Sequence, residues 1–301
     1  RLGHEMVELP KCVGRILAEY ISADMDIPPF DRSQMDGYAV RCIDTVNAPV
    51  ELELVGESAA GRGWHSTLRA GEAVAIMTGA PVPAGADAVQ KIELTRHIPD
   101  NESRVEILEP TNAGQHIVGA GAEIEKGTSI FQIGERITAN MIAPMASFGY
   151  SRVMAGSLPR VSILGTGSEI VEIDETPGLD QIRNSNSVML EVLASRVGAT
   201  TRILSNAKDD LPALKGTIEA AAADSDVLFL TGGVSVGKYD LTKLAISELG
   251  AEIFFERVRL KPGKPAVFAR LNETLIFALP GNPVSAAVTF HLFVRPALSN
   301  L

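Results

Sequence analysis

The chain has 301 residues, a net charge of −10 and a sequence pI of about 5.1. This acidic balance argues against a nucleic-acid partner, and no apolar run approaches the ~20 residues that span a bilayer. Cys12 and Cys42 form no CxxC pair, which fits reduced thiols, and the five histidines are scattered, which argues against a histidine-built metal site. We expect a cytoplasmic protein of more than one domain, with no membrane partner.

The first half of the chain predicts a compact, mostly-β module. Short strand candidates separated by Gly/Pro turns occur at residues 50–55, 73–76, 88–92 and 105–108. The apolar segments 13–20 and 137–148, which precede and follow these candidates, are helix-like. A β-module inserted between two elements of a connecting domain is the economical interpretation.

Beyond Pro159 the pattern is typical of a parallel α/β sheet, because short apolar runs alternate with helix-like segments. Strands are expected at residues 161–164, 203–204, 227–230, 253–258, 266–271 and 274–278. Helices are expected at residues 187–197, 211–223, 241–249 and from residue 283 to about residue 294. Asn282 and Pro283 suit the N-cap and first position of the last helix, and Asp209-Asp210 is a helix start signal.

Two segments combine charged and turn residues beside a strand. Residues 31–40 read DRSQMDGYAV, which suits a solvated turn as well as a functional loop, and Asp36-Gly37 is also a hairpin signature. Residues 165–169 read GTGSE, but Ile170 stands where a dinucleotide-binding fingerprint needs glycine. This segment is better interpreted as a tight turn that presents Glu169 at the carboxyl edge of the sheet, where open α/β sheets bind ligands.

Polar and acidic residues gather at strand ends and helix starts. Residues 181–187 read QIRNSNS, and a helix cap explains only one or two of these polar side chains, so we favour a ligand-facing loop that includes Ser185. Mg²⁺ is usually held by one or two carboxylates together with ligand phosphates. Each carboxylate alone is more simply an N-cap or a surface charge, so a metal site requires two or three to converge. The candidates are Asp36, Glu169, Asp209 and Asp240.

Three glycine-rich elements indicate a phosphorylated ligand. They are TGGVSVGKYD at residues 231–240, KPGKP at 261–265 and LPGNPVS at 279–285. The first lacks the Gly-Lys-Ser/Thr ending of a P-loop, which excludes P-loop chemistry as the leading idea. Gly232 and Gly233 permit close backbone approach to an oxyanion, and Ser235 can donate to it. Lys261 and Lys264 are point charges that suit phosphate or molybdate-like anions.

Taken in chain order, these motifs resemble the molybdopterin molybdotransferase family, which includes the bacterial MoeA proteins and the E domain of gephyrin. The resemblance covers nearly the whole chain, and six long motifs in the family's order make it specific. The matching stretches are residues 29–40 (PFDRSQMDGYAV), 77–81 (MTGAP), 181–187, 231–240, 261–265 and 279–285.

The resemblance implies an enzyme that takes adenylylated molybdopterin and molybdate, inserts molybdenum into the dithiolene and releases AMP, assisted by Mg²⁺ or another divalent cation. It implies catalytic roles for Asp36, Glu169, Asp209, Asp240, Lys261 and Lys264, of which the four carboxylates would also hold the metal. It implies cofactor-binding roles for Thr78, Ser185, Gly232, Gly233, Ser235, Arg257, Pro280, Gly281, Pro283 and Ser285.

The same resemblance implies the architecture and the partners. Residues 158–301 would form a three-layer, molybdopterin-binding-like α/β domain with a mostly parallel sheet. Residues 1–28 and 123–157 would form a mixed, elongated connecting domain, and residues 29–122 the inserted mostly-β module. The family's C-terminal β-barrel is expected to be absent and its N-terminal helix shortened. A homodimer is implied, with the cleft completed by the partner's β-module, and molybdopterin adenylyltransferase is implied as the upstream donor.

One segment departs from the family pattern and keeps a second hypothesis open. Residues 114–123 (GQHIVGAGAE) lack the arginines that the family usually carries, and Glu123 stands where it has aspartate. Because positive charge is lost here, the alternative hypothesis is a non-catalytic protein of the same fold that binds molybdopterin or acts as a scaffold. A third hypothesis, a nicotinamide-dependent oxidoreductase, rests only on residues 165–167. Release of AMP would support the transferase, ligand binding without product would support the binding protein, and binding of NADH would support the oxidoreductase.

Overall fold

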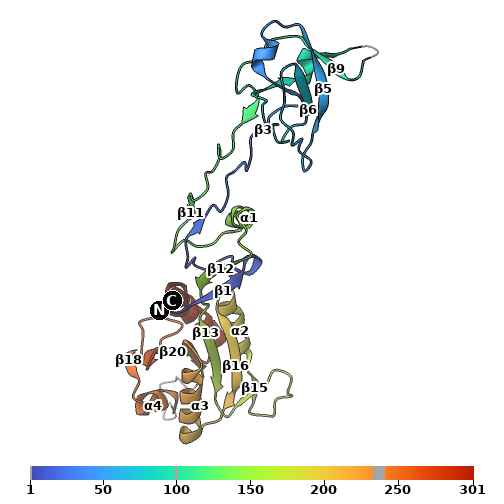
Figure 1. The fold of residues 1–301 in the computed structure, drawn as a ribbon. Coiled ribbons are helices and arrows are strands. Elements are labelled where there is room, and N and C mark those ends of the chain that lie inside the picture. The colour runs from blue at the N-terminus through green and yellow to red at the C-terminus, as the bar shows by residue number, and fades with distance from the viewer. Residues whose placement is uncertain (1, 99–100, 233–240) are drawn as a thin grey trace. The chain divides into compact units, whose positions relative to one another are not determined.

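A computed structural model describes residues 2–98, 101–232 and 241–301, and the chain divides into two compact units (Figure 1). The α/β unit comprises Arg1–Ala18, Arg136–Thr138 and Arg152–Leu301. The β unit comprises Glu19–Glu135 and Ala139–Ser151. No helix in the described part of the chain combines the length and apolar character needed to cross a membrane.

The α/β unit has three layers around a six-stranded sheet, as predicted. The strand order is β16 (Thr200–Ala207), β13 (Arg160–Thr166), β17 (Val227–Thr231), β20 (Thr274–Leu279), β19 (Val267–Leu271) and β18 (Glu252–Phe255). The first four strands are parallel to one another, and β19 and β18 are antiparallel to their neighbours. One face is covered by α3 (Leu211–Ala223) and α4 (Leu241–Glu248), and the other by α2 (Ser185–Ser195) and α5 (Pro283–Thr289).

The central strand β17 shows why this sheet is buried on both faces. Its residues alternate, so that Leu228 and Leu230 pack in the core of α3 and α4, whereas Phe229 packs in the core of α2 and α5. Phe229 is fully buried, with its ring centroid 6.3 Å from that of Phe277 and 6.1 Å from that of Phe290, both edge-on. A continuous apolar strand with helices on both sides is the pattern that parallel sheets require.

The C-terminal helical segment extends further than the sequence predicted. After α5 the chain forms one π-helical stretch, Phe290–Val294, and then α6, Arg295–Asn300. Pro296 has no backbone N–H to donate to the preceding turn, so an ordinary α-helical bond is lost there. The wider π turn accommodates this loss, and the helical direction continues past the predicted end near residue 294.

The β unit is built on a second six-stranded sheet. Its order is β7 (Ala88–Lys91), β4 (Gly37–Val40), β6 (Glu72–Ile76), β5 (Val50–Ser58), β9 (Arg104–Ile107) and β8 (Thr95–His97). β5 and β6 are parallel, and the other described neighbours are antiparallel. Alternate residues of β4 enter different cores, Tyr38 and Val40 on one side and Ala39 on the other. The predicted strands of this half are thereby confirmed.

Short paired strands and 3₁₀ turns complete the fold. β1 (His4–Glu8) pairs with β12 (Arg152–Gly156), β2 (Ile21–Ser22) with β11 (Ser129–Phe131), and β3 (Arg32–Ser33) with β10 (Ile117–Val118). β14 (Ile170–Val171) runs parallel to β15 (Ile182–Arg183). The 3₁₀ turns are Leu9–Lys11, Cys42–Thr45 and Ile92–Leu94.

The prediction of a helix at residues 13–20 is wrong, whereas the one at 137–148 is confirmed by α1 (Ala139–Ser147). Gly14 has φ of +89°, and its N–H donates to the carbonyl of Ile137 at 2.8 Å. Ile16 and Leu17 then form isolated antiparallel bridges instead of helical turns. Leu17 is fully buried, whereas Val13, Ile16 and Tyr20 are exposed, so this apolar run marks neither a helix nor a buried face.

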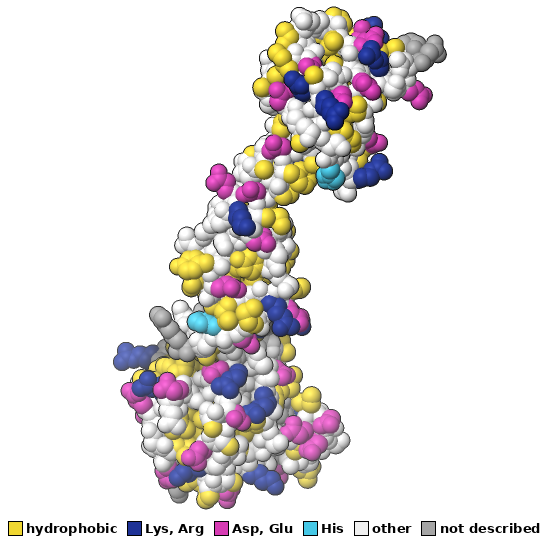
Figure 2. Space-filling view, viewed as in Figure 1, with side chains coloured by type: hydrophobic (Ala, Val, Ile, Leu, Met, Phe, Trp, Pro, Cys, Tyr) yellow, Lys and Arg dark blue, Asp and Glu magenta, His cyan; other side chains and the backbone are white. Residues whose placement is uncertain are grey.

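On the face drawn in Figure 2, basic and acidic side chains are interspersed over the α/β unit and do not gather in one basic surface. This distribution agrees with the net charge of −10. An anion-binding site on this chain therefore depends on a few local groups, chiefly backbone N–H groups and individual lysines.

Candidate active site

The candidate site lies at the carboxyl edge of the α/β unit's parallel strands. The segments that follow β16, β13, β17 and β20 all leave the sheet at this edge because the four strands run in one direction. They carry, in that order, Asp209, Glu169, Gly232 and Gly281. In open α/β sheets this edge is the usual ligand position.

A glycine turn directs Glu169 to this edge. Gly167 has φ of +140°, and a Cβ added there would collide with the carboxylate of Glu169, which folds over the turn. The Gly167 N–H donates to the carbonyl of Ala207 at 3.1 Å, which fixes the turn against the end of β16. Glu169 itself is exposed. The geometry agrees with the predicted tight turn.

Asp209 is tied to the same turn by two reciprocal hydrogen bonds. The Ser168 N–H donates to Oδ2 of Asp209 at 3.1 Å, and the Asp209 N–H donates to the hydroxyl of Ser168 at 3.3 Å. The neighbouring Asp210 is the N-cap of α3, because its carboxylate accepts from the N–H of Ala213 at 2.8 Å. Capping therefore falls on Asp210, and Asp209 is left exposed beside the Glu169 turn.

The first and third glycine elements lie beside each other. Gly232 has φ of +98°, and a Cβ there would collide with the carbonyl oxygen of Thr166. A Cβ added at Gly281 would lie 3.7 Å from Cα of Gly232. Pro280 is buried, and after it Asn282 caps α5 by accepting from the N–H groups of Val284 at 3.0 Å and Ser285 at 3.3 Å.

Three of the predicted residues belong to the starts of helices at this edge. Pro283 occupies the first turn of α5, and Ser285, also in that turn, is only 7% exposed. Ser185 is the first residue of α2 and is exposed. The N-cap of α2 is the buried Asn184, whose side chain accepts from the N–H of Ser187 at 3.1 Å.

Sequence reasoning singled out the segment 181–187 but missed the connecting role of its two asparagines and of Asn206. Nδ2 of Asn184 donates to Oδ1 of Asn206 at 2.6 Å, and Nδ2 of Asn206 donates to the carboxylate of Glu172 at 3.1 Å. Asn186 bridges Thr231 and the carbonyl of Gly281. The available signal was an asparagine beside a strand end, which is too common to single out without knowledge of the register.

The lysine-bearing loop is anchored by its glycine. Gly263 has φ of +109° and is buried, and a Cβ there would lie 2.9 Å from Cγ2 of Thr289 and 3.7 Å from the carbonyl oxygen of Ser285. The loop therefore packs against α5, so the second glycine element lies beside the third. Lys261 and Lys264 flank this buried glycine and are both exposed.

Arg257 is also exposed, near the base of the lysine-bearing loop. The N–H of Val258 donates to the carbonyl of Lys264 at 3.0 Å, which closes the loop. With the exposed Arg259, four cationic side chains are thus carried by one short segment, residues 257–264, which contacts α5. Such an arrangement suits the neutralisation of an anionic ligand.

In the β unit, two of the predicted site residues, Asp36 and Thr78, are hydrogen-bonded to each other. Oδ1 of Asp36 accepts from the backbone N–H of Thr78 at 2.7 Å and from its hydroxyl at 2.9 Å. These two hydrogen bonds, the backbone one foremost, hold the pKa of Asp36 below its ordinary value. The exposed carboxylate therefore stays ionised at neutral pH. Gly37 begins β4, whose partners are β6 and β7, so Asp36-Gly37 is not a two-residue hairpin turn.

The segment that departs from the family pattern is firmly attached to the motif at residues 31–40. Oε1 of Glu123 accepts from Nη2 of Arg32 at 2.7 Å, and Oδ1 of Asp31 accepts from the N–H of Ala120 at 2.8 Å. β10 pairs with β3 next to these contacts. The altered segment is thus a structured neighbour of the motif, and Glu123 is paired with its arginine.

Three predicted residues, Gly233, Ser235 and Asp240, lie outside the described residues. Within the described ranges, no group of three or more histidine, cysteine, aspartate or glutamate side chains could hold a metal ion. Glu169 and Asp209 are brought to one edge of the α/β unit, whereas Asp36 belongs to the β unit.

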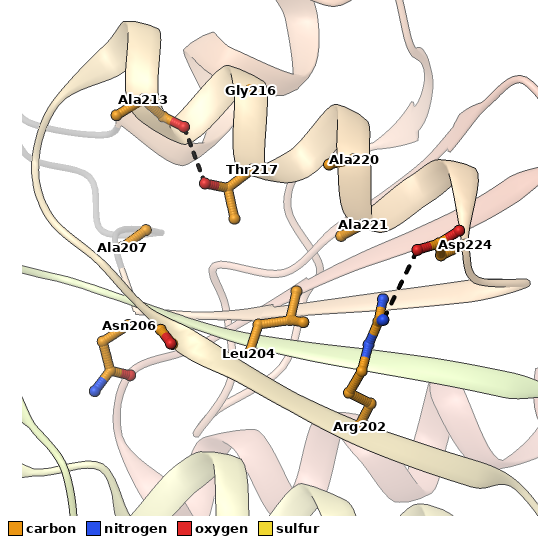
Figure 3. Close-up of a pocket in the computed structure, with 11 residues that line it drawn as sticks. Arg202, Leu204, Asn206, Ala207, Ala213, Gly216, Thr217, Ala220, Ala221 and Asp224 are labelled. Atoms are coloured by element: carbon orange, nitrogen blue, oxygen red, sulfur yellow. Dashed lines mark hydrogen bonds and ion pairs between the residues drawn. The ribbon is translucent and has the colours of Figure 1, made fainter.

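A groove between α3 and β16 lies outside this collection of residues. Figure 3 shows its lining, which includes Leu204, Gly216 and Ala220 and carries the ion pair of Arg202 and Asp224, with 3.8 Å between nitrogen and oxygen. Its volume is about 650 Å³. The lining is mostly small and apolar and holds none of the predicted site residues, so we do not assign the chemistry to it.

Comparison with known proteins adds a family assignment to this geometry. Residues 1–149 match the family described as "MoeA N-terminal region (domain I and II)", and residues 162–300 match "Probable molybdopterin binding domain". The molybdopterin molybdenumtransferase of Bacillus subtilis is 38% identical over 299 residues, which are 98% of this chain and 70% of that protein. That of a Nostoc species is 38% identical over 304 residues, 99% of this chain and 69% of the relative.

A solved structure supports the same assignment. The crystal structure of the molybdopterin biosynthesis MoeA protein from Pyrococcus horikoshii has a TM-score of 0.85 and 34% sequence identity to this chain. The match covers 99% of this chain and 75% of that one. The likeness therefore extends over both units of the fold.

Proposed function

The chain belongs to the MoeA family, whose curated members are named molybdopterin molybdenumtransferases, and we propose that it inserts molybdenum from molybdate into adenylylated molybdopterin and releases AMP. It is a transferase of molybdenum cofactor biosynthesis. The observation that carries the proposal is the convergence of two glycine turns, two carboxylates and the lysine-bearing loop within one unit. We further propose that residues 158–301 form the molybdopterin-binding domain, residues 1–28 and 123–157 the connecting domain, and residues 29–122 the inserted module.

Glycine turns are suited to the anionic parts of such a substrate. Gly232 and Gly281 lie beside each other and neither carries a side chain, so their peptide groups can approach a ligand closely. Pro280, Pro283 and Ser285 would line the ligand from the start of α5. Ser185, at the start of α2, would contact it from a second helix. Gly233 and Ser235 would extend this surface beyond Gly232.

The carboxylates of this edge fit a divalent cation of the magnesium type. Glu169 and Asp209 supply hard oxygen ligands on two turns that are hydrogen-bonded to each other through Ser168. Two carboxylates together with substrate phosphates are a usual set for Mg²⁺, which explains why a complete protein cage is not required. When bound, the cation would stabilise charge on the cleaved phosphate. Asp240 is proposed to join this set.

The lysine-bearing loop would stabilise the negative charge on the cleaved phosphate from the side of α5. Lys261 and Lys264 are exposed on a loop whose backbone is packed against α5 at Gly263, so both side chains start from a fixed segment. Arg257 adds a third positive charge at the loop's base. Positive groups that are already in position stabilise developing negative charge without reorganisation. These residues would therefore hold and polarise the phosphate of AMP as it leaves.

A homodimer would bring Asp36 and Thr78 into the mechanism. We propose that the partner's β-module contributes this pair to complete the cleft, with an upstream adenylyltransferase supplying the substrate. The lowered pKa of Asp36 supports such a role, because a carboxylate that stays ionised can take part in holding a cation. Sedimentation analysis of the purified chain tests the dimer directly, and a monomer at micromolar concentration would contradict it.

The test of the activity is the release of AMP. The chain is incubated with adenylylated molybdopterin, molybdate and Mg²⁺, and AMP and active cofactor are measured beside a Lys261→Ala control. We expect release that the control loses. If no AMP appears above the control but calorimetry still detects tight binding, the chain is a molybdopterin-binding protein without turnover, and the arginine-free segment 114–123 becomes the first place to search for the reason.

A further inference from the structure

The buried side chain of Asn186 occupies the place where hydrogen bonding between β17 and β20 ends. The last pair of residues in register is Thr231 with Leu279, after which both chains turn away from the sheet. Nδ2 of Asn186 donates to Oγ1 of Thr231 at 2.8 Å and to the carbonyl of Gly281 at 2.8 Å. One amide group from α2 therefore continues the connection between the two strands beyond the sheet.

The orientation of this amide is determined by its partners. The carbonyl oxygen of Gly281 can only accept a hydrogen bond, so the nitrogen of Asn186 must face it and not the oxygen. The opposite orientation would place two oxygens against each other. Both protons of the Asn186 amide are consequently used, one by the segment that leads into Gly232 and the other by Gly281 itself.

The oxygen of the same amide makes the arrangement unusual. Asn186 is 8% exposed, and its Oδ1 has no hydrogen-bond partner among the described residues. Burying a carbonyl oxygen without a donor is unfavourable for folding. A residue chosen for stability alone would avoid this, so its retention here points to a requirement at the ligand edge.

We propose that Asn186 is a positioning residue, which holds the Thr231–Gly232 and Gly281 turns at the separation that the anionic ligand needs. This inference rests on the proposed function, because those turns are taken to bind the substrate. Asn186 acts through the backbone of the two turns. Neither Gly232 nor Gly281 has a side chain that could maintain their spacing, so the amide of Asn186 supplies the constraint.

Two substitutions of Thr231 test whether its hydrogen bond with Asn186 matters for activity, rather than the shape of its side chain. Thr231→Val removes the hydroxyl that accepts from Asn186 and keeps the side chain's shape, whereas Thr231→Ser retains the hydroxyl. We expect Asn186→Ala and Thr231→Val each to lower kcat/KM for AMP release about tenfold to hundredfold, since small displacements of a binding group have effects of this size. Thr231→Ser should stay within about threefold of wild type.

Thr274→Val is the matched control, because Thr274 lies at the opposite end of β20. Its buried hydroxyl donates to the carbonyls of Ala222 at 2.7 Å and Ser225 at 2.8 Å, so it too connects β20 to neighbouring backbone. The Thr274→Val variant should lower the melting temperature, as Asn186→Ala does, and should leave kcat/KM unchanged. Equal losses of kcat/KM in the two variants would overturn the proposal, because general destabilisation would then explain both.

Hydrogen exchange of the ligand-free protein separates this inference from the activity. Asn186→Ala should speed amide exchange in peptides that cover Gly232 and Gly281, and Thr274→Val should not. Unchanged exchange at both turns would overturn the positioning role even if the wild type releases AMP. Faster exchange together with a wild type that releases no AMP would support the positioning role and reject the proposed activity.

Discussion

Replacing Gly232 by alanine should destabilise the α/β unit strongly, whereas the same replacement at Gly216 should stabilise it. Gly232 has φ of +98°, and a Cβ there would collide with the backbone oxygen of Thr166. Gly216 lies inside α3, and a Cβ there meets nothing within 4 Å. The two substitutions add the same methyl group to the same unit, so the comparison isolates the local backbone.

The magnitudes follow from these environments. A non-glycine residue in a sparsely populated backbone conformation costs about 1–3 kcal/mol, and an extra methyl in a packed region costs about 1–3 kcal/mol. We therefore expect Gly232→Ala to lower the free energy of unfolding by about 2–6 kcal/mol. Gly216→Ala should raise it by about 0.5–1 kcal/mol, because alanine restricts the unfolded chain and favours helix.

The assay is urea unfolding followed by circular dichroism at the helix band, because α2 to α6 all belong to the α/β unit. Fluorescence of Trp64, the chain's single tryptophan, reports on the β unit. The reasoning is refuted if Gly232→Ala changes the helix transition by less than about 0.5 kcal/mol, the ordinary effect of a surface substitution. It is also refuted if both glycine variants shift the transition in the same direction.

Three further predictions concern charged groups. If the partner subunit completes the cleft, mixing inactive Asp36→Asn and Lys261→Ala proteins should restore AMP release to about a quarter of wild type, and no recovery would contradict the shared cleft. Thr78→Val removes the hydroxyl that donates to Asp36 and keeps the backbone N–H that also donates to it. In a carbon-13 NMR titration the pKa of Asp36 should therefore rise and still stay below its ordinary value. An unchanged pKa would refute this expectation. Burial alone would raise the pKa of Asp226, but the hydrogen bonds and the ion pair with Arg160 lower this pKa overall. The stability that Asp226 contributes is therefore complete above the unfolded pKa of about 3.9 and is lost as pH falls through the folded pKa. Asp226→Asn should flatten the pH dependence of unfolding in that acidic range, and an unchanged slope would contradict the assignment.

Much of the α/β unit could be predicted because its signals are local. The apolar run at residues 227–230 and the acidic start before residue 211 lead directly to β17 and α3. The prediction for segment 13–20 failed because its backbone forms antiparallel bridges to Arg136 and Ala155, which lie more than a hundred residues away in the chain. An apolar run does not show which distant backbone the segment will pair with.

The same limit applies to the candidate site. Glu169 and the glycine turns were identifiable from residue type and position, since a turn after a buried strand has a recognisable pattern. Asn186 was not, because its partners lie 45 and 95 positions away and are met only when the strands are in register. Positioning side chains of this kind carry no sequence signature of their own and emerge only from the folded chain.

The β14–β15 pair has a practical consequence for labelling the protein. The Ile182 N–H donates to the carbonyl of Glu169 at 2.8 Å, and the Asn184 N–H donates to that of Val171 at 2.9 Å, so the base of the intervening loop is closed. Leu179 is fully exposed in that loop. Because this closure separates residue 179 from Glu169, a fluorophore or affinity peptide attached at residue 179 would report from beside the candidate site without altering it.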